Sequence, residues 1–100
     1  MTEQEEKVLH KAIEVYGRIP QIDMMIEEMS ELTKALCKYK RAYFDVAETA
    51  MPTDIVDNVY EEIADVKIMI RQMEMIFGES NVEAEMREKI ERLERNLNDE

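Results

Sequence analysis

Four carboxylates at matched positions are the part of this sequence that could do chemistry. Two segments of eleven residues align without a gap 34 positions apart, so that Glu28 matches Glu62 and Glu31 matches Asp65. Within each segment the two acids are about one helical turn apart, and their side chains point in nearly the same direction. Carboxylates gathered at one place repel each other unless a cation lies between them. The repeat therefore predicts a metal site.

The ligand types indicate which metal. The acidic segments offer only carboxylates, and the single histidine, His10, lies outside them. All-oxygen ligands suit Mg²⁺, with Mn²⁺ as an alternative, whereas zinc, copper and di-iron sites normally use histidine or cysteine. A di-iron site of the ferritin type needs Glu-x-x-His, and Lys7 stands three residues before His10. Mg²⁺ held by carboxylates commonly keeps positions for substrate phosphates, which favours phosphate-ester or phosphoanhydride chemistry.

A solvated acidic face is the structural alternative to a metal site. The C-terminal part of the chain has the pattern of such an exposed helix, with an acid four residues before a base at Glu85–Lys89, Glu88–Arg92 and Glu91–Arg95. In the acidic segments Glu27 is instead followed at this spacing by another acid, Glu31. The corresponding functional alternative is a non-enzymatic acidic helical protein that binds a basic partner or mimics DNA.

Composition limits the class of protein. One hundred residues, 45% of them hydrophobic and 37% charged, predict one folded domain. The net charge of −11 argues against binding nucleic acid or anionic membranes through bulk charge. The N-terminal residues lack the apolar core of a secretion signal, and no apolar run approaches the roughly 20 residues of a membrane span, so we expect a cytoplasmic protein. The single cysteine, Cys37, has no disulfide partner and is expected to be buried.

The chain is predicted to be all-helical, a bundle of about four helices. It has two glycines, two prolines and no strand-type alternation. Gly17 should end the first helix and Gly78 the third. Pro20 should open the second helix, and Thr53 and Ser80 should cap the third and fourth. The helices are expected over about 3–16, 21–44, 53–77 and from 80 onwards, with a turn at 45–52. If the second and third helices are antiparallel neighbours, all four carboxylates reach similar heights.

The two long helices carry apolar stripes that predict the core. These stripes are Ile22, Met25, Ile26, Met29, Leu36 and Tyr43 in the second helix, and Val56, Val59, Tyr60, Ile63, Val66, Ile70 and Phe77 in the third. Ile68, Met75 and Ile76 lie off the stripe of the third helix. An apolar second side predicts burial of that helix between subunits.

The acidic motifs resemble those of the MazG-like all-alpha nucleoside triphosphate pyrophosphohydrolases. The resemblance covers roughly residues 16–97 and is closest to the short single-domain members. The residues that carry it are Glu27-Glu28-x-x-Glu31, Glu62-x-x-Asp65 within the run 61–66, Gln21, and Arg87-x-Lys89-x-x-Arg92. The long stretch between the motifs, with its aromatic residues, departs from the pattern and leaves the base preference open.

The resemblance implies a function and roles for these residues. The chain would be a single MazG-like helical domain over 1–100 that cleaves a nucleoside triphosphate to the monophosphate and pyrophosphate. It would assemble as a homodimer or homotetramer. The implied Mg²⁺ ligands are Glu28, Glu31, Glu62 and Asp65. Glu27 is expected to position the attacking water, Lys89 and Arg92 to contact phosphate oxygens, and Gln21 to help shape the substrate pocket.

Overall fold

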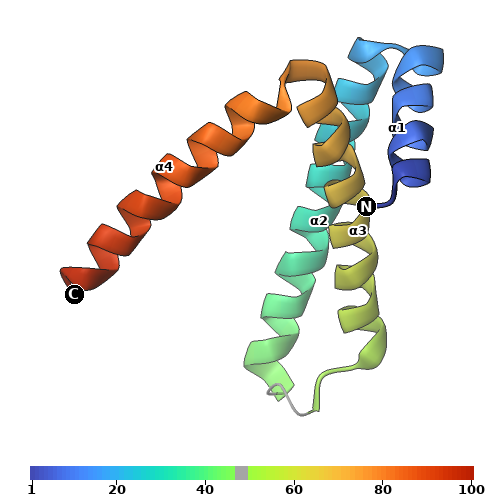
Figure 1. The fold of residues 1–100 in the computed structure, drawn as a ribbon. Helices are drawn as coiled ribbons and strands as arrows, with labels where there is room; N and C mark the ends of the chain where they lie inside the picture. The colour runs from blue at the N-terminus through green and yellow to red at the C-terminus, as the bar shows by residue number, and fades with distance from the viewer. Residues whose placement is uncertain (47–49) are drawn as a thin grey trace.

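The computed structural model describes residues 1–46 and 50–100, and it is all-helical (Figure 1). Its four helices are α1 (Glu3–Tyr16), α2 (Arg18–Val46), α3 (Thr53–Phe77) and α4 (Glu79–Asn98). The described residues contain no strand, so the predicted all-helical class is confirmed. None of the described helices is both long enough and apolar enough to cross a membrane.

The centre of the fold is an antiparallel hairpin of α2 and α3, with α1 packed beside its upper part and α4 pointing away from it (Figure 1). Among the described residues only three apolar side chains are buried, Ala35, Val66 and Met69. All three lie on the hairpin. One chain therefore has a small core for its length.

Two glycines set the ends of the helices. Gly17 has a φ of 92° and Gly78 a φ of 121°, a region that other residues rarely adopt, and each donates its N–H to the last turn of the helix before it. Gly17 also starts α2, since its carbonyl accepts from the N–H of Gln21 at 3.3 Å. The helix therefore begins at Arg18, three residues earlier than predicted, and Pro20 lies in its first turn, where a missing donor does no harm.

The two predicted side-chain caps are wrong. Thr53 is the first helical residue of α3, preceded by Pro52, which offers no side-chain hydrogen bond. Ser80 is the second residue of α4, and Gly78 precedes that helix. The predicted turn at 45–52 begins too early, because α2 continues to Val46; residues 47–49 of this turn lie outside the described residues.

Arg71 of α3 joins three helices. Its guanidinium donates from Nε and Nη2 to both carboxylate oxygens of Glu6 in α1, at 2.7–2.9 Å. It also lies 3.3 Å from Glu74 of α3 and 3.3 Å from Glu79 of α4. The hydrogen bonds to Glu6, and secondarily the bond to Glu74, raise the pKa of Arg71 above its ordinary value, while desolvation acts in the opposite direction. The planar fork of arginine suits this two-point contact better than the single ammonium of lysine.

We therefore expect Arg71→Lys to lower the thermal unfolding midpoint by several degrees, because one ammonium cannot replace the two-point contact with Glu6. The measurement is circular dichroism during heating. Glu3→Gln is the control, since its ion pair with Lys7 is long, at 4.0 Å, and exposed. An Arg71→Lys midpoint equal to that of the control would show that the network does not hold the helices together.

Much of the predicted core lies on the surface of one chain. Of the two apolar stripes only Val66 is buried, and Ile22, Met25, Val56 and Val59 are half-buried. The other eight stripe residues are 40–65% exposed: Ile26, Met29, Leu36, Tyr43, Tyr60, Ile63, Ile70 and Phe77. Cys37 is exposed as well, so its predicted burial is wrong. Helical periodicity identifies the apolar side of a helix but not which other helix covers it.

The three apolar residues off the third-helix stripe have surroundings within the chain. Ile68 lines a surface pocket with Val8 and Leu9 of α1. Met75 and Ile76 are half-buried. The second apolar side of α3 is therefore partly covered by α1, although Ile68 remains 41% exposed. Of the thirteen exposed large apolar residues of α2 and α3, eight belong to the stripes.

Candidate functional site

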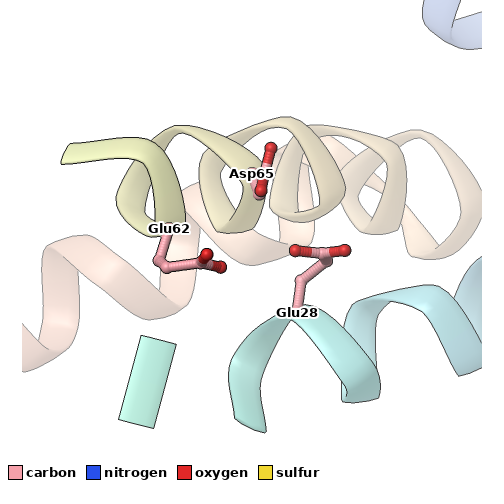
Figure 2. Close-up of side chains that lie close together, drawn as sticks. All are labelled: Glu28, Glu62 and Asp65. Carbon is pink, nitrogen blue, oxygen red and sulfur yellow. The ribbon is translucent and has the colours of Figure 1, made fainter. Parts of the chain in front are cut away.

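Three of the four predicted metal ligands meet in the structure. Carboxylate oxygens of Glu28 in α2 and of Glu62 and Asp65 in α3 lie within 4.8 Å of one another. Figure 2 shows Glu28 and Glu62 pointing toward each other across the space between the two helices, with Asp65 one turn further along α3. The antiparallel hairpin brings these residues to one height, as the repeat predicts. We call this set the carboxylate trio.

One oxygen of the trio is buried and has no partner. Glu62 Oε2 is inaccessible to solvent and accepts no hydrogen bond from the described residues. A buried carboxylate oxygen without a donor is costly, and native proteins normally satisfy such an atom with a hydrogen bond, a water or an ion. The arrangement therefore fits a bound cation better than a free acidic surface.

The electrostatics of the trio agree with its geometry. Desolvation, followed by the charges of Asp65 and Glu62, raises the pKa of Glu28 above its ordinary value. Desolvation, followed by the charges of Asp65 and Glu31, raises the pKa of Glu62. Both carboxyls therefore bind a proton more tightly than a free carboxyl does. A divalent cation would relieve the same repulsion.

The fourth predicted ligand and the predicted catalytic residue lie at the edge of the trio. Glu31 is close enough to raise the pKa of Glu62, but its carboxylate is 3.5 Å from Lys34 and its side chain is 44% exposed. Glu27 is exposed, and its charge contributes to the raised pKa of Glu28. Both residues flank the trio without joining it.

A pocket lies next to the trio on the side of α1. Gln21 is only 6% exposed and lines this surface pocket of about 640 Å³. The lining residues are Tyr16, Pro20, Gln21, Asp23, Met24 and Met69. Met24 is one helical turn from Glu28, and Met69 is one turn from Asp65, so the pocket adjoins the trio along both helices. Gln21 therefore lies about two turns from the carboxylates.

The predicted phosphate contacts on α4 are not brought to the trio within one chain. Lys89 and Arg92 are exposed on α4, which contacts α3 at their junction and makes no contact with α1 or α2 (Figure 1). The acid-before-base pairs predicted for this helix are not among the ion pairs closer than 4.0 Å in the described part of the chain.

Two residues at the pocket were missed by sequence reasoning. Met24 and Met69 line it, and neither was singled out, since isolated methionines in a helix read as ordinary core residues. Their spacing of four residues from Glu28 and Asp65 is the signal that could have found them.

No protein-family model matches the chain, and neither a curated protein nor a solved structure is significantly similar to it.

Proposed function

We propose that the protein is a Mg²⁺-dependent nucleoside triphosphate pyrophosphohydrolase of the MazG-like type, releasing nucleoside monophosphate and pyrophosphate. The observation that carries the proposal is the carboxylate trio with its buried, unpartnered Glu62 oxygen. Glu28, Glu62 and Asp65 would hold the cation, and Glu31, beside Glu62, would be the fourth ligand. The cation would neutralise charge that develops on the phosphates; Mn²⁺ has the same preference for oxygen ligands.

The chain's own residues have separate tasks in this reaction. Glu27, which is exposed and adjacent to Glu28 in α2, would orient a water and accept its proton. The pocket beside the trio would receive the nucleoside, because its methionines and Tyr16 offer apolar surface to a flat base and Gln21 offers one amide for hydrogen bonds. The triphosphate would then extend along the hairpin toward the carboxylates.

Assembly belongs to the proposal as well. Lys89 and Arg92 remain the proposed phosphate contacts, which requires α4 to approach a site that it does not approach within one chain. A homodimer or homotetramer is the proposed form of the enzyme. No role for nucleic acid or a membrane is proposed, since the net charge of −11 repels both.

The rival function is that of an acidic helical protein that binds a basic partner. Such a protein needs its acids on an outer, solvated face, where each carboxylate is free to pair. The trio favours the enzyme, because Glu28 and Glu62 are half-buried between helices. Oε2 of Glu62 is also buried, so it is not accessible to the basic groups of a partner protein.

The test is product analysis with a panel of ordinary and modified nucleoside triphosphates in the presence of Mg²⁺. We expect equimolar monophosphate and pyrophosphate, and we expect EDTA to abolish turnover because the cation is removed. Release of single orthophosphate, or full activity in EDTA, would exclude the proposed reaction.

A further inference from the structure

One chain exposes far more surface than a compact protein of its mass. Its accessible surface is 7828 Å², whereas a folded monomer of 11.9 kDa is expected to expose about 6,000 Å². Its radius of gyration is 17.1 Å, against about 13 Å expected for 100 residues. The excess of roughly 1,800 Å² is the scale of surface that proteins bury against a partner.

Much of the exposed apolar surface lies on one side of the α2–α3 hairpin. In α2, Met29 and Leu36 come directly after Glu28 and Ala35, which face α3. In α3, Ile63 and Ile70 come directly after Glu62 and Met69, which face α2. One position is a rotation of about 100°. In antiparallel neighbours this rotation turns both rows toward the same side of the pair. The eight exposed stripe residues of α2 and α3 therefore form a single surface, which we call the apolar face.

The opposite side of the hairpin is the one that α1 covers and that carries the pocket. Ile68, on that side of α3, lies against Val8 and Leu9 of α1. The pocket beside the trio is also formed there, with Tyr16 of α1 in its wall. In the described part of the chain Arg18 lies over the ring of Phe77 at one end of the apolar face, and the other seven residues of this face are 40–65% exposed.

Helix α4 carries a second uncovered apolar row. Its four members are 51–63% exposed and follow one another at intervals of four, three and four residues: Met86, Ile90, Leu93 and Leu97. This spacing keeps side chains on one line of a helix that packs against other helices. The rows of the apolar face have intervals of three, seven and seven residues, from Ile26 to Tyr43 in α2 and from Tyr60 to Phe77 in α3, which also keep their side chains on one line of each helix. We call the α4 row the α4 stripe.

The α4 stripe does not cover the apolar face of its own chain. Only Gly78 separates α3 from α4, and α4 contacts α3 at this junction and neither α1 nor α2. The junction is also fixed at both ends. Arg18 donates to the carbonyl of Ile76 at 2.8 Å, and Arg71 lies 3.3 Å from Glu79. Figure 1 shows α4 leaving the bundle at this point.

We propose that the α4 stripe of a second copy lies on the apolar face, and that the exchange is reciprocal, so that the chain forms a two-fold symmetric dimer through its C-terminal helices. This inference rests on the proposed assembly and names its contact surface, which lies on the side of the hairpin opposite the pocket. The proposed phosphate contacts of Lys89 and Arg92 are not made through this surface. The inference does not require that the protein hydrolyse nucleotides.

The size and charge of the two surfaces fit each other. Twelve large apolar side chains, each about half exposed, offer on the order of 1,000 Å² per chain, against about 800 Å² per partner in a standard interface. Lys40 and Lys67 lie within the rows of the apolar face, and neither is in an ion pair with another described residue. Glu83 and Glu94 border one side of the α4 stripe, where opposite charges would meet, and Lys89 borders its other side.

The first test is the mass in solution of two matched variants. The wild-type protein should have twice the 11.9 kDa mass of the chain, or an even multiple of it, by light scattering at micromolar concentration. Leu93→Glu places a charge in the α4 stripe and should raise the dissociation constant of the dimer at least about tenfold. Ala84→Glu adds the same charge on the opposite side of α4 and should change that constant by less than about twofold. A wild-type mass of 11.9 kDa, or equal effects of both variants, would overturn the proposal.

The second test locates the contact and does not need a destabilised variant. A benzoylphenylalanine photo-crosslinker at Leu93 is activated in a mixture of unlabelled and ¹⁵N-labelled copies, and the adducts are mapped by mass spectrometry. The proposal requires adducts to residues 26–43 or 60–77 of the differently labelled copy. Adducts confined to the same copy would mean a closed monomer, and adducts only to α4 of the other copy would mean a simple helix pair; either result overturns it. Neither readout involves activity, so the proposed reaction can fail while this contact stands.

Discussion

Replacement of Glu62 by glutamine should lower the rate of pyrophosphate release at least about a hundredfold, as the loss of a principal electrostatic element in an active site does. Glu28→Gln and Asp65→Asn should lower the rate to a similar extent, since oxygens of the three carboxylates lie within 4.8 Å of one another and would bind one cation together. The substitutions keep the shape of each side chain and remove its charge. The measurement is steady-state kinetics at saturating Mg²⁺.

Two further variants make this prediction sharper. Glu31→Gln should cost about tenfold, because Glu31 lies at the edge of the trio and pairs with Lys34. Glu85→Gln, on exposed α4, removes the same charge away from the trio and should leave the rate within about twofold of the wild type. Comparable losses in Glu85→Gln and Glu62→Gln would mean that the trio is not the catalytic site.

Glu62→Gln should change the thermal unfolding midpoint in opposite directions in EDTA and in Mg²⁺. In EDTA at neutral pH, Glu62→Gln should raise the unfolding midpoint, because it removes a charge that desolvation and neighbouring carboxylates make costly. With Mg²⁺ the order should reverse. A cation at a hundredfold excess over its Kd stabilises the folded wild type by about 2.7 kcal/mol, and the variant binds it less tightly.

The pH dependence in EDTA follows from the raised pKa of Glu62. A carboxyl whose pKa is raised on folding contributes stability that is complete below its ordinary pKa of 4.5 and is lost as the pH rises through the folded value. The advantage of Glu62→Gln should therefore be full at pH 7–8 and vanish as the pH falls toward 4.5, where Glu62 is itself protonated. Calorimetry across this range tests it; a difference that does not change with pH would contradict the assigned cause.

Glu6→Gln is a control that should change the stability at neutral pH in the direction opposite to Glu62→Gln in EDTA. The hydrogen bonds from Arg71 lower the pKa of Glu6, so its stabilising charge is present above the ordinary pKa and is lost as the pH falls below it. At pH 7 this variant should be less stable than the wild type, with or without Mg²⁺. A Mg²⁺-dependent change in Glu6→Gln would point to a cation site elsewhere than the trio.

The sequence predicts the helices and their register, but not the caps of α3 and α4. Four helices and the two glycine ends follow from residue type and spacing, and the register of the repeat placed Glu28 beside Glu62 and Asp65. Helical periodicity and an antiparallel hairpin are enough for this, because both depend on residues close in the sequence.

What the sequence could not predict depends on which surfaces meet. The apolar stripe of α2 predicts a buried surface, but its members from Ile26 to Tyr43 are exposed, because α1 lies on the other side of the hairpin and α4 does not contact α2. The network around Arg71 links residues 65 positions apart in the chain, which no local pattern reveals. Glu31 lies outside the trio, and its carboxylate is 3.5 Å from the ammonium of Lys34.

The proposed reaction is tested by the amounts of pyrophosphate and of orthophosphate released from nucleoside triphosphates by the wild type and by Glu62→Gln, each with Mg²⁺ and with EDTA. We expect the wild type with Mg²⁺ to form pyrophosphate and monophosphate in equal amounts, and we expect pyrophosphate release to fall at least about a hundredfold in the variant and to cease in EDTA. Orthophosphate as the product, or equal rates of pyrophosphate release by the wild type and Glu62→Gln, would contradict it.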